Sequence, residues 1–223
     1  DILLSKEKNL PAYQEAFEYY FASIMSPYAS FAIQGADRVD KLDVKMILTG
    51  HGPVIDTRVK ETIAAFRDLG KKYLPSNDEK HVTLVYASCY GYTEGMAKAL
   101  KEKLEADGKE VSFYKIDALN YAEVKPQILA SIRTSGLVLF GTPTILQDAI
   151  CLFYDLASSL PIPVIQNKKA SVFGDYGWSG EAVNNLSQFL AIRKFKVIPG
   201  YRYSFKVDEA GLKGIEDYYQ TLK

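Results

Sequence analysis

From His81 to the C-terminus, short apolar runs alternate with segments of helical periodicity, which restricts this part of the chain to few folds. The runs compatible with strands are His81–Ala87, Glu110–Ile116, Gly136–Gly141, Lys169–Gly174 and Lys196–Pro199, the last with room to continue toward Val207. The helical segments are Glu94–Asp107, Val124–Thr134, Asp148–Ser159, Glu181–Arg193 and Glu209–Leu222. This alternation predicts an α/β fold with a doubly wound, five-stranded parallel sheet. Ligands of such sheets bind beyond the carboxyl ends of the strands.

The residues before this region have a different pattern. Residues 9–34 show helical spacing that Pro27 should break or bend, and a second helix is expected over Phe31–Leu42. Val44–Leu48 is predicted as a strand and Thr57–Leu74 as a further helix. A polar, turn-forming stretch then interrupts the pattern. We therefore expect a domain boundary that separates residues 1–78, an appendage of helices and strand, from residues 79–223.

Composition excludes several classes of protein. The 223 residues are 48% hydrophobic, enough for a sizeable core, and their formal net charge is zero. Without a basic block, neither a nucleic-acid partner nor a polybasic membrane anchor is expected. The two cysteines, Cys89 and Cys151, lack the spacing of a disulfide scaffold or a zinc site, which favours a reducing, cytoplasmic location. Cys151 is expected in the core. No spanning apolar stretch or signal peptide is visible, and because residue 1 is Asp1 rather than Met, a start inside a longer or processed product is an open interpretation.

A hydroxyl-rich turn with one glycine follows the first strand of the predicted sheet. It consists of Ser88, Cys89, Tyr90, Gly91, Tyr92 and Thr93. A strand that leads through such a turn into a helix directs backbone N–H groups and the positive end of the helix dipole at one place, which suits a phosphate. The turn lacks the Gly-Lys-Ser/Thr ending of a nucleoside-triphosphate loop and the three glycines of a dinucleotide fingerprint. A small mononucleotide is the predicted ligand, and a turn that merely caps the helix is the alternative.

Two further loops follow strands of the same sheet. One presents hydroxyls and an amide after a proline-stiffened start, with the candidate residues Thr142, Pro143, Thr144, Ile145 and Gln147. The other combines glycines with two aromatic rings, with the candidate residues Asp175, Tyr176, Gly177, Trp178, Ser179 and Gly180. Hydroxyls and amides can bind the polar edge of a flat ring and an aromatic side chain can cover its face, whereas partial burial in the core is the alternative for the aromatics. Together with the phosphate turn, these loops predict FMN.

The same loops carry a family resemblance. Residues 81–223 resemble a flavodoxin-type domain, and the stretches 142–145 and 176–181 resemble the flavodoxin domain of flavodiiron proteins, also called A-type flavoproteins. The N-terminal part resembles the end of the metallo-β-lactamase-like domain of that family, through Tyr19–Phe21, the helix at Phe31, Leu42–Ile47 and Gly50–Pro53. The resemblance covers essentially the whole chain. It implies the strand order 2-1-3-4-5, with residues 1–78 as a C-terminal remnant of the metallo-β-lactamase-like domain and residues 79–223 as the FMN-binding domain.

The chain also departs from the family pattern. Tyr92 stands where flavodoxins commonly have Asn, and Asp175 stands where this family often has Ser. His51 matches only the last iron ligand of the family, and its His-x-Glu-x-Asp-His stretch, a further His and a bridging Asp are missing. The resemblance therefore implies a metal-binding role for His51 only if another segment or chain supplies the remaining ligands; otherwise His51 is a loop residue. A split protein, a cut or truncated product and an evolutionary remnant all fit this pattern.

The resemblance implies an electron-transfer flavoprotein, the flavin module of a flavodiiron-type oxygen or nitric oxide reductase. A redox donor such as a rubredoxin or a flavin reductase and a homo-oligomer, usually a head-to-tail dimer, go with that function. No side chain is expected to act as an acid or base, because the flavin carries the chemistry. The acidic Asp148, Asp175 and Glu181 in or beside the ring loops predict a low potential for the second one-electron reduction. The alternatives are a free-standing NAD(P)H:quinone-type flavin oxidoreductase and a cofactor-free interaction module.

Overall fold

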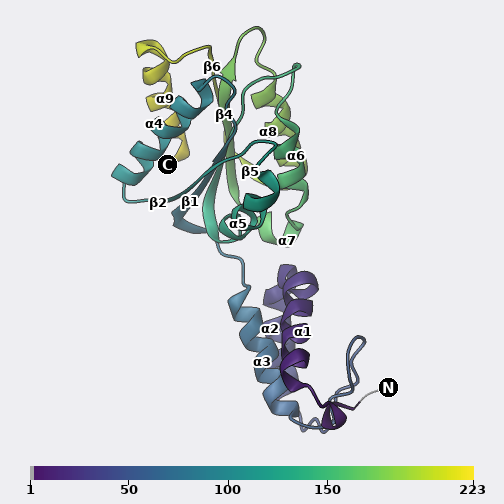
Figure 1. Ribbon diagram of the computed structural model, residues 1–223. Helices are drawn as coiled ribbons and strands as arrows, with labels where there is room; N and C mark the ends of the chain where they lie inside the picture. Colours follow the sequence, from purple (N-terminus) through teal and green to yellow (C-terminus); the bar gives the residue numbers. More distant parts are fainter. Residues whose placement is uncertain (1–2) are drawn as a thin grey trace. The chain divides into compact units, whose positions relative to one another are not determined.

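The computed structural model describes residues 3–223, and the chain divides into two compact units, residues 1–75 and residues 76–223. The second unit is a parallel sheet between two layers of helices (Figure 1). Its strands are β1 (Asp78–Tyr86), β2 (Glu110–Lys115), β3 (Ser135–Gly141), β4 (Lys169–Tyr176), β5 (Lys196–Val197) and β6 (Tyr201–Ser204). The strand order β2-β1-β3-β4-β5 confirms the predicted 2-1-3-4-5 topology.

The fifth position of the sheet is filled by two short strands rather than one. Lys196 and Val197 of β5 pair with the start of β4, and β6 pairs with its end, from Phe173 to Tyr176. Pro199 lies between the two pieces, and because proline cannot donate a backbone hydrogen bond, it favours an interruption here. The predicted continuation of the last strand toward Val207 is thus present as a separate strand.

Helices cover both faces of the sheet. On one side lie α4 (Tyr92–Ala106) and α9 (Glu209–Leu222), and on the other lie α5 (Tyr121–Thr134), α6 (Cys151–Ser158) and α8 (Ala182–Ile192), with the short α7 (Ile162–Ile165) at the lower end (Figure 1). Side chains alternate along each strand, so Val82 and Leu84 of β1 enter the α4/α9 core while Val85 enters the opposite core. Both cores are closely packed around bulky side chains such as Phe140 and Phe173.

The first unit is helical. It contains the 3-10 turn η1 (Leu4–Lys6), α1 (Leu10–Tyr20), the π-helical turn η2 (Phe21–Met25), the 3-10 turn η3 (Ser26–Tyr28), α2 (Ala29–Asp40) and α3 (Val59–Lys72). The helix predicted over residues 9–34 is therefore interrupted around Pro27, as expected. Phe21 is fully buried, with its ring 5.0 Å from that of Phe66 and 5.9 Å from that of Tyr73.

The strand predicted over Val44–Leu48 is wrong. In the described residues this segment forms only an isolated bridge, in which the backbones of Ile47 and Ile55 exchange two hydrogen bonds of 3.0 Å. A single hairpin without further strands beside it is at best marginally stable, so the alternating pattern alone does not produce a sheet here.

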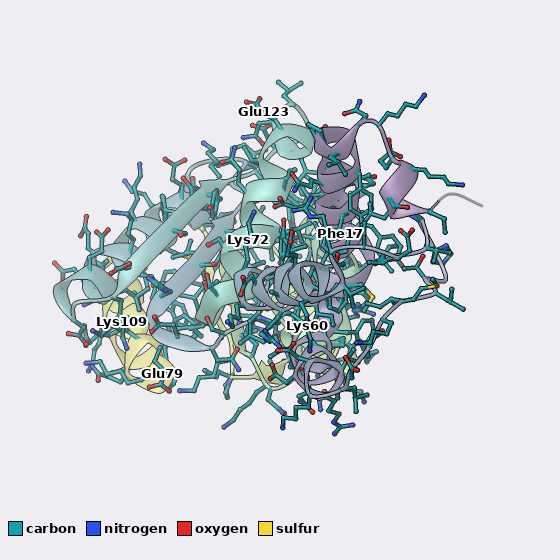
Figure 2. All side chains as sticks on the ribbon, turned by 90° about the horizontal axis from the view of Figure 1, so that it is seen from below. Phe17, Lys60, Lys72, Glu79, Lys109 and Glu123 are labelled. Carbon is teal, nitrogen blue, oxygen red and sulfur yellow. The ribbon has the colours of Figure 1, made fainter. Side chains whose placement is uncertain are left out.

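Charged side chains project from the surfaces of both units, for example Lys60 and Lys72 of the first (Figure 2). In the second unit Lys109 and Glu79 lie close together, and the Lys109 ammonium donates to the Glu79 carbonyl at 3.0 Å. Among residues 3–223, no helix is long and apolar enough to cross a membrane.

Candidate functional site

Asp175 brings the three predicted loops together at the carboxyl end of the sheet. Its side chain accepts a hydrogen bond from the Thr93 hydroxyl in the phosphate turn. Its backbone carbonyl accepts the Thr144 N–H at 2.9 Å in the second loop. Asp175 itself lies near the end of β4, at the start of the third loop. Because β1, β3 and β4 are neighbours in the sheet, their loops meet at its carboxyl end, where ligands of such sheets bind.

The phosphate turn has the geometry of an anion-binding helix start. Gly91 precedes α4 with a φ of 82°, a conformation that favours glycine, and a Cβ there would meet open space. The Ser88 hydroxyl oxygen accepts the N–H groups of Gly91 at 3.0 Å and Glu94 at 3.3 Å. As at any helix start, the N–H groups of the first turn, including those of Tyr92 and Thr93, have no acceptor within the helix. The turn thus caps α4, as the structural alternative required, and also leaves donors for a phosphate.

The exposure of the residues in the phosphate turn is graded. Cys89 and Tyr90 are exposed, Tyr92 is half-buried and Thr93 is fully buried. The turn is therefore open to solvent at Cys89 and Tyr90 and packed into the unit at Thr93. Cys89 lies on the outer side of the turn.

The second loop is a tight hairpin whose tip points into solvent. Ile145 and Asp148 exchange two backbone hydrogen bonds of 2.9 and 3.0 Å around Leu146 and Gln147. Both tip residues have positive φ, 52° and 63°, which costs free energy for non-glycine residues. Such strain persists only where the surroundings fix it, and the Asn185 amide does so by donating to the Gln147 carbonyl at 3.3 Å.

The start of this loop lies very close to β4. Thr142 is fully buried and its N–H donates to the Phe173 carbonyl at 2.9 Å. A Cβ on Gly174 would lie 1.7 Å from the Thr142 carbonyl oxygen, so only glycine fits at that position. Pro143 is also buried, whereas Thr144 is half-buried and faces the site region through its bond to Asp175.

The third loop places one aromatic ring in contact with the protein and leaves the other free. Tyr176 is half-buried, with the Arg202 guanidinium 5.8 Å from the centre of its ring. Trp178 is 98% exposed, so the alternative of partial core packing is wrong for this residue. An exposed tryptophan at the edge of a site is available to cover a flat ring. Gly180 takes a φ of 75°, and its carbonyl accepts from Arg202 at 2.7 Å.

Acidic groups near the loops are held in their charged form. Burial alone would raise the pKa of Asp148, but hydrogen bonds from the Tyr154 hydroxyl, the Ala149 N–H and Asn185 outweigh it and lower that pKa. The ammonium groups of Lys98 and Lys115, at 2.8 and 2.9 Å, likewise lower the pKa of Glu94 in the first turn of α4. Asp148 and Glu94 are therefore carboxylates in their charged form, and Glu94 is neutralised by the two lysines beside it.

Three contributors to the site were not predicted from the sequence. Arg202 comes from β6, Asn185 from α8 and Tyr154 from α6. None of the three loops contains Lys or Arg, yet Arg202 supplies a cation beside the third loop. The expected continuation of the last strand toward Val207 includes Arg202, but the contact of Arg202 with the third loop depends on the pairing of β6 with β4.

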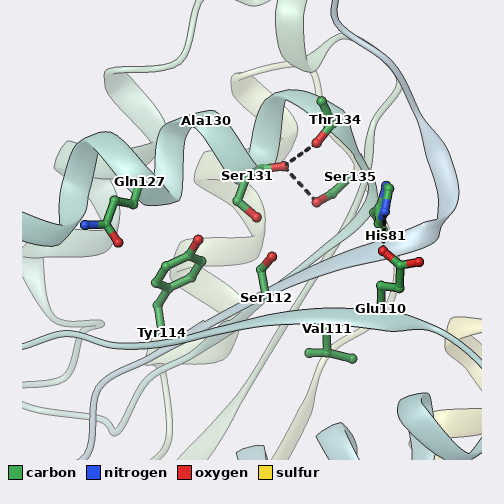
Figure 3. A pocket seen from close by; sticks show the side chains of 10 residues that line it. All are labelled: His81, Glu110, Val111, Ser112, Tyr114, Gln127, Ala130, Ser131, Thr134 and Ser135. Atoms are coloured by element: carbon green, nitrogen blue, oxygen red, sulfur yellow. Dashed lines mark hydrogen bonds and ion pairs between the residues drawn. The ribbon is translucent and has the colours of Figure 1, made fainter.

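A hollow of the same unit lies away from the three loops. It has a volume of about 560 Å³ and lies between the edge strand β2 and α5, lined by residues such as Tyr114, Gln127 and Ser131 (Figure 3). His81, at its rim, contacts Glu110 at 2.6 Å and Asp78 at 3.2 Å.

The N-terminal unit carries the predicted metal ligand and an apolar groove. His51 is exposed, with its ring 5.6 Å from that of Tyr20. Both line a groove of about 590 Å³ together with apolar residues such as Phe17, Ile47 and Phe66. Among residues 3–223, no group of three or more His, Cys, Asp or Glu side chains could hold a metal ion. The described residues therefore do not fit an iron centre on their own. Cys151, expected in the core, is instead exposed at the start of α6.

Comparison with known proteins assigns the second unit. A family model for flavodoxin matches residues 84–221. The chain belongs to the flavodoxin family. Flavodoxin domains bind FMN, and the cradle formed by the three loops fits this cofactor.

Relatives extend the similarity into the first unit. Flavo-diiron protein FprA2 of Clostridium acetobutylicum is 30% identical over 92% of this chain and 51% of its own length. Type A flavoprotein fprA of Rhodobacter capsulatus is 31% identical over 89% of this chain and 46% of its own length. The flavodiiron resemblance found in the sequence is thereby confirmed. The chain spans about half the length of these relatives.

Solved structures show the same fold. The rubredoxin oxygen:oxidoreductase of Desulfovibrio gigas matches 100% of this chain and 54% of its own, with a TM-score of 0.68 and 21% identity. The flavodiiron protein of Giardia intestinalis matches 100% of this chain and 54% of its own, with a TM-score of 0.66 and 22% identity. Similarity at this level of identity concerns the fold alone.

Proposed function

We propose that this chain is the electron-transfer flavin module of a flavodiiron-type oxygen or nitric oxide reductase. The observation that carries the proposal is the convergence of a helix-start anion site, a ring-edge hairpin and an aromatic glycine loop at Asp175. When bound, FMN supplies one-electron chemistry, and the protein supplies binding, orientation and electrostatics. The relatives named for flavodiiron chemistry support the wider assignment.

Each loop has a distinct task in this proposal. The phosphate turn holds the phosphate through the first N–H groups of α4 and its hydroxyls. The hairpin of the second loop contacts the ribityl chain and the ring edge, with Thr142 fixing its start. The third loop, from Asp175 to Gly180, closes the opposite side, and Trp178 covers a ring face. No side chain needs to transfer a proton.

Flavin content tests this proposal directly. The purified chain should be yellow, with a flavin absorption spectrum and roughly one FMN per chain, and the apoprotein should quench the fluorescence of added FMN. A colourless protein that fails to bind added FMN would instead support a cofactor-free module. Rapid NAD(P)H oxidation by the chain alone would favour the quinone-reductase alternative.

The N-terminal unit is proposed to be the C-terminal remnant of a metallo-β-lactamase-like domain, with the domain division at residues 78 and 79. Support comes from the apolar groove beside His51 and from relatives about twice as long that match both units. A second polypeptide or a further segment would cover the groove and supply the remaining iron ligands. Protein prepared from its native cells should then contain iron and that partner, whereas residues 1–223 alone should bind flavin without iron. Native protein with flavin but neither iron nor partner would remove the diiron role.

The partners and location follow from the same assignment. We propose a rubredoxin or a flavin reductase as electron donor, a homodimer as the assembly and the cytoplasm as the location. The iron-loaded assembly should reoxidise its reduced flavin rapidly with oxygen or nitric oxide, as stopped-flow absorbance would record. Equally fast reoxidation by residues 1–223 without iron would contradict a reductase that passes electrons to a diiron centre.

A further inference from the structure

Asp175 contacts both other loops: its carboxylate accepts from Thr93 in the phosphate turn, and its backbone carbonyl accepts from Thr144 in the second loop. We propose that Asp175 is a positioning residue that engages the Thr93 hydroxyl and thereby lowers the selectivity of the site for FMN over riboflavin. The inference rests on the proposed flavin-binding function. It concerns the discrimination between a phosphorylated flavin and its unphosphorylated parent.

Thr93 can donate only one hydrogen bond through its side chain, and Asp175 already accepts it. A threonine hydroxyl has a single proton to donate. Thr93 is fully buried and donates that proton to the Asp175 carboxylate, which has only acceptors to offer. While this bond exists, the Thr93 hydroxyl cannot donate to a phosphate. The turn then binds the phosphate with its backbone N–H groups and with one hydroxyl fewer.

The negative charge of Asp175 also acts on a phosphate directly, by repulsion. Within residues 3–223 no Lys or Arg forms an ion pair with this carboxylate. The nearby cations are engaged elsewhere: Lys98 and Lys115 bind Glu94, and Arg202 binds the Gly180 carbonyl. A partly buried carboxylate without a neutralising partner repels a phosphate dianion more strongly than a solvated one would. Riboflavin has no phosphate and escapes this repulsion.

Substitution of the Asp175 carboxylate by an amide removes both the competition for the Thr93 proton and the repulsion of the phosphate, without changing how the side chain packs. Asp175→Asn keeps the size of the side chain and an oxygen acceptor, removes the charge, and adds N–H donors that can bind the Thr93 oxygen. The Thr93 proton is then free to point at a phosphate. Glu181→Gln is the matched control, because Glu181 is also an acid of this region, but within residues 3–223 its side chain bonds only the Ser179 hydroxyl, at 2.8 Å.

The experiment measures dissociation constants of FMN and riboflavin by fluorescence quenching of the flavin, with the apoprotein of the whole chain. We expect Asp175→Asn to tighten FMN binding about tenfold and to change riboflavin binding less than about twofold. Glu181→Gln should change the ratio of the two constants by less than about threefold. In a Thr93→Val background, Asp175→Asn should tighten FMN binding only about threefold, because the competition for the hydroxyl is absent.

Three results would overturn the inference. Equal changes for FMN and riboflavin would mean that Asp175 only maintains the shape of the loops. An unchanged tenfold effect in the Thr93→Val background would mean that Asp175 does not act through Thr93. If the wild type and all variants bind neither flavin, the proposed function fails and the inference with it. This last result differs from the others because riboflavin binding is lost as well.

Discussion

Asp175 brings a negative charge to a place where the protein is expected to accept two electrons in sequence. Each added electron makes the bound cofactor more negative, so a nearby carboxylate opposes the second addition more than the first. We predict that Asp175→Ser raises the potential of the second one-electron reduction by about 60 mV, which corresponds to about a tenfold change for one electron. A spectroelectrochemical titration measures both steps. An unchanged second potential in Asp175→Ser would reject this electrostatic account, and Glu181→Gln provides the comparison for a carboxylate that bonds Ser179 rather than Thr93.

Trp178 illustrates the opposite case, a side chain that forms no ring contact or hydrogen bond within residues 3–223. Since it is 98% exposed, its removal costs the fold little, and we predict that Trp178→Ala changes the free energy of unfolding by less than about 0.5 kcal/mol. Loss of the ring that covers the flavin should nevertheless weaken FMN binding roughly tenfold. Chemical denaturation and fluorescence titration measure the two quantities. Phe31→Ala, at a ring 67% exposed in the N-terminal unit, should alter neither, and a full-strength FMN complex in Trp178→Ala would exclude the ring-covering role.

At the scale of elements, the contact between β4 and the second loop depends on the absence of a side chain. A Cβ at Gly174 would meet backbone, which cannot move away as a flexible side chain could. We predict that Gly174→Ala destabilises the protein by about 3 kcal/mol and weakens FMN binding, because the ring-edge loop must shift. Gly95 offers the control, since a Cβ at this glycine of α4 would meet nothing within 4 Å.

Gly95→Ala should stabilise the helix by up to about 1 kcal/mol. Thermal unfolding of both variants measures the contrast. Equal melting temperatures for Gly174→Ala and the wild type would show that the strand and loop can separate at no cost.

The alternation of apolar runs and helical segments was sufficient to predict the parallel sheet and the three loops. From His81 onward, most apolar positions of the sequence pattern are buried or half-buried in the folded unit. The same reasoning failed at Val44–Leu48, where an alternating pattern has no second strand beside it apart from the bridge to Ile55. Arg202 could not be assigned to the site from the sequence, since its approach to Tyr176 depends on how β6 pairs with β4. Contacts of this kind are long-range and leave no local signal.

At the scale of the whole molecule, a buried lysine ties the start of the flavodoxin unit to its sheet. The Lys168 side chain is fully buried, and its ammonium donates to the Ser76 carbonyl and the Asn77 side-chain oxygen, both at 2.8 Å, and to the Ser135 carbonyl. The compact unit accordingly begins at Ser76, three residues before the boundary expected from the sequence. We predict that a chain of residues 76–223 folds and binds FMN.

A chain of residues 79–223 lacks two of the three acceptors and should be less stable than residues 76–223 by about 2–4 kcal/mol, because a buried charge loses its partners. Urea unfolding of the two chains gives the difference. Equal stability would show that water replaces both lost acceptors.

The same lysine makes stability depend on pH. Burial lowers the pKa of Lys168 to about 8, below its ordinary value of 10.5. Below pH 8 the side chain is charged in both states, and the folded state bears the full cost of burying that charge. Between pH 8 and 10.5 the unfolded chain binds more protons than the folded one, so this group adds stability as the pH rises.

Relative to Lys168→Met, the free energy of unfolding of the wild type should therefore increase by roughly 2–3 kcal/mol across this range. Buried tyrosines such as Tyr218, whose pKa burial raises, titrate at alkaline pH in both proteins and cancel in the comparison. Denaturation at several pH values measures the difference. A constant difference would show that Lys168 keeps its proton throughout.

The two-piece fifth strand bears on how copies of this protein behave in a crowded cell. A long, regular strand at the rim of a sheet offers a template on which another chain can add its own strand and begin an aggregate. This edge of the sheet consists of the two residues of β5 and the four residues of β6, with Pro199 between the two strands. Another strand could therefore not form a continuous ladder of backbone hydrogen bonds along it. The break at Pro199 thus removes a continuous template from this one edge of the sheet, opposite the edge formed by β2.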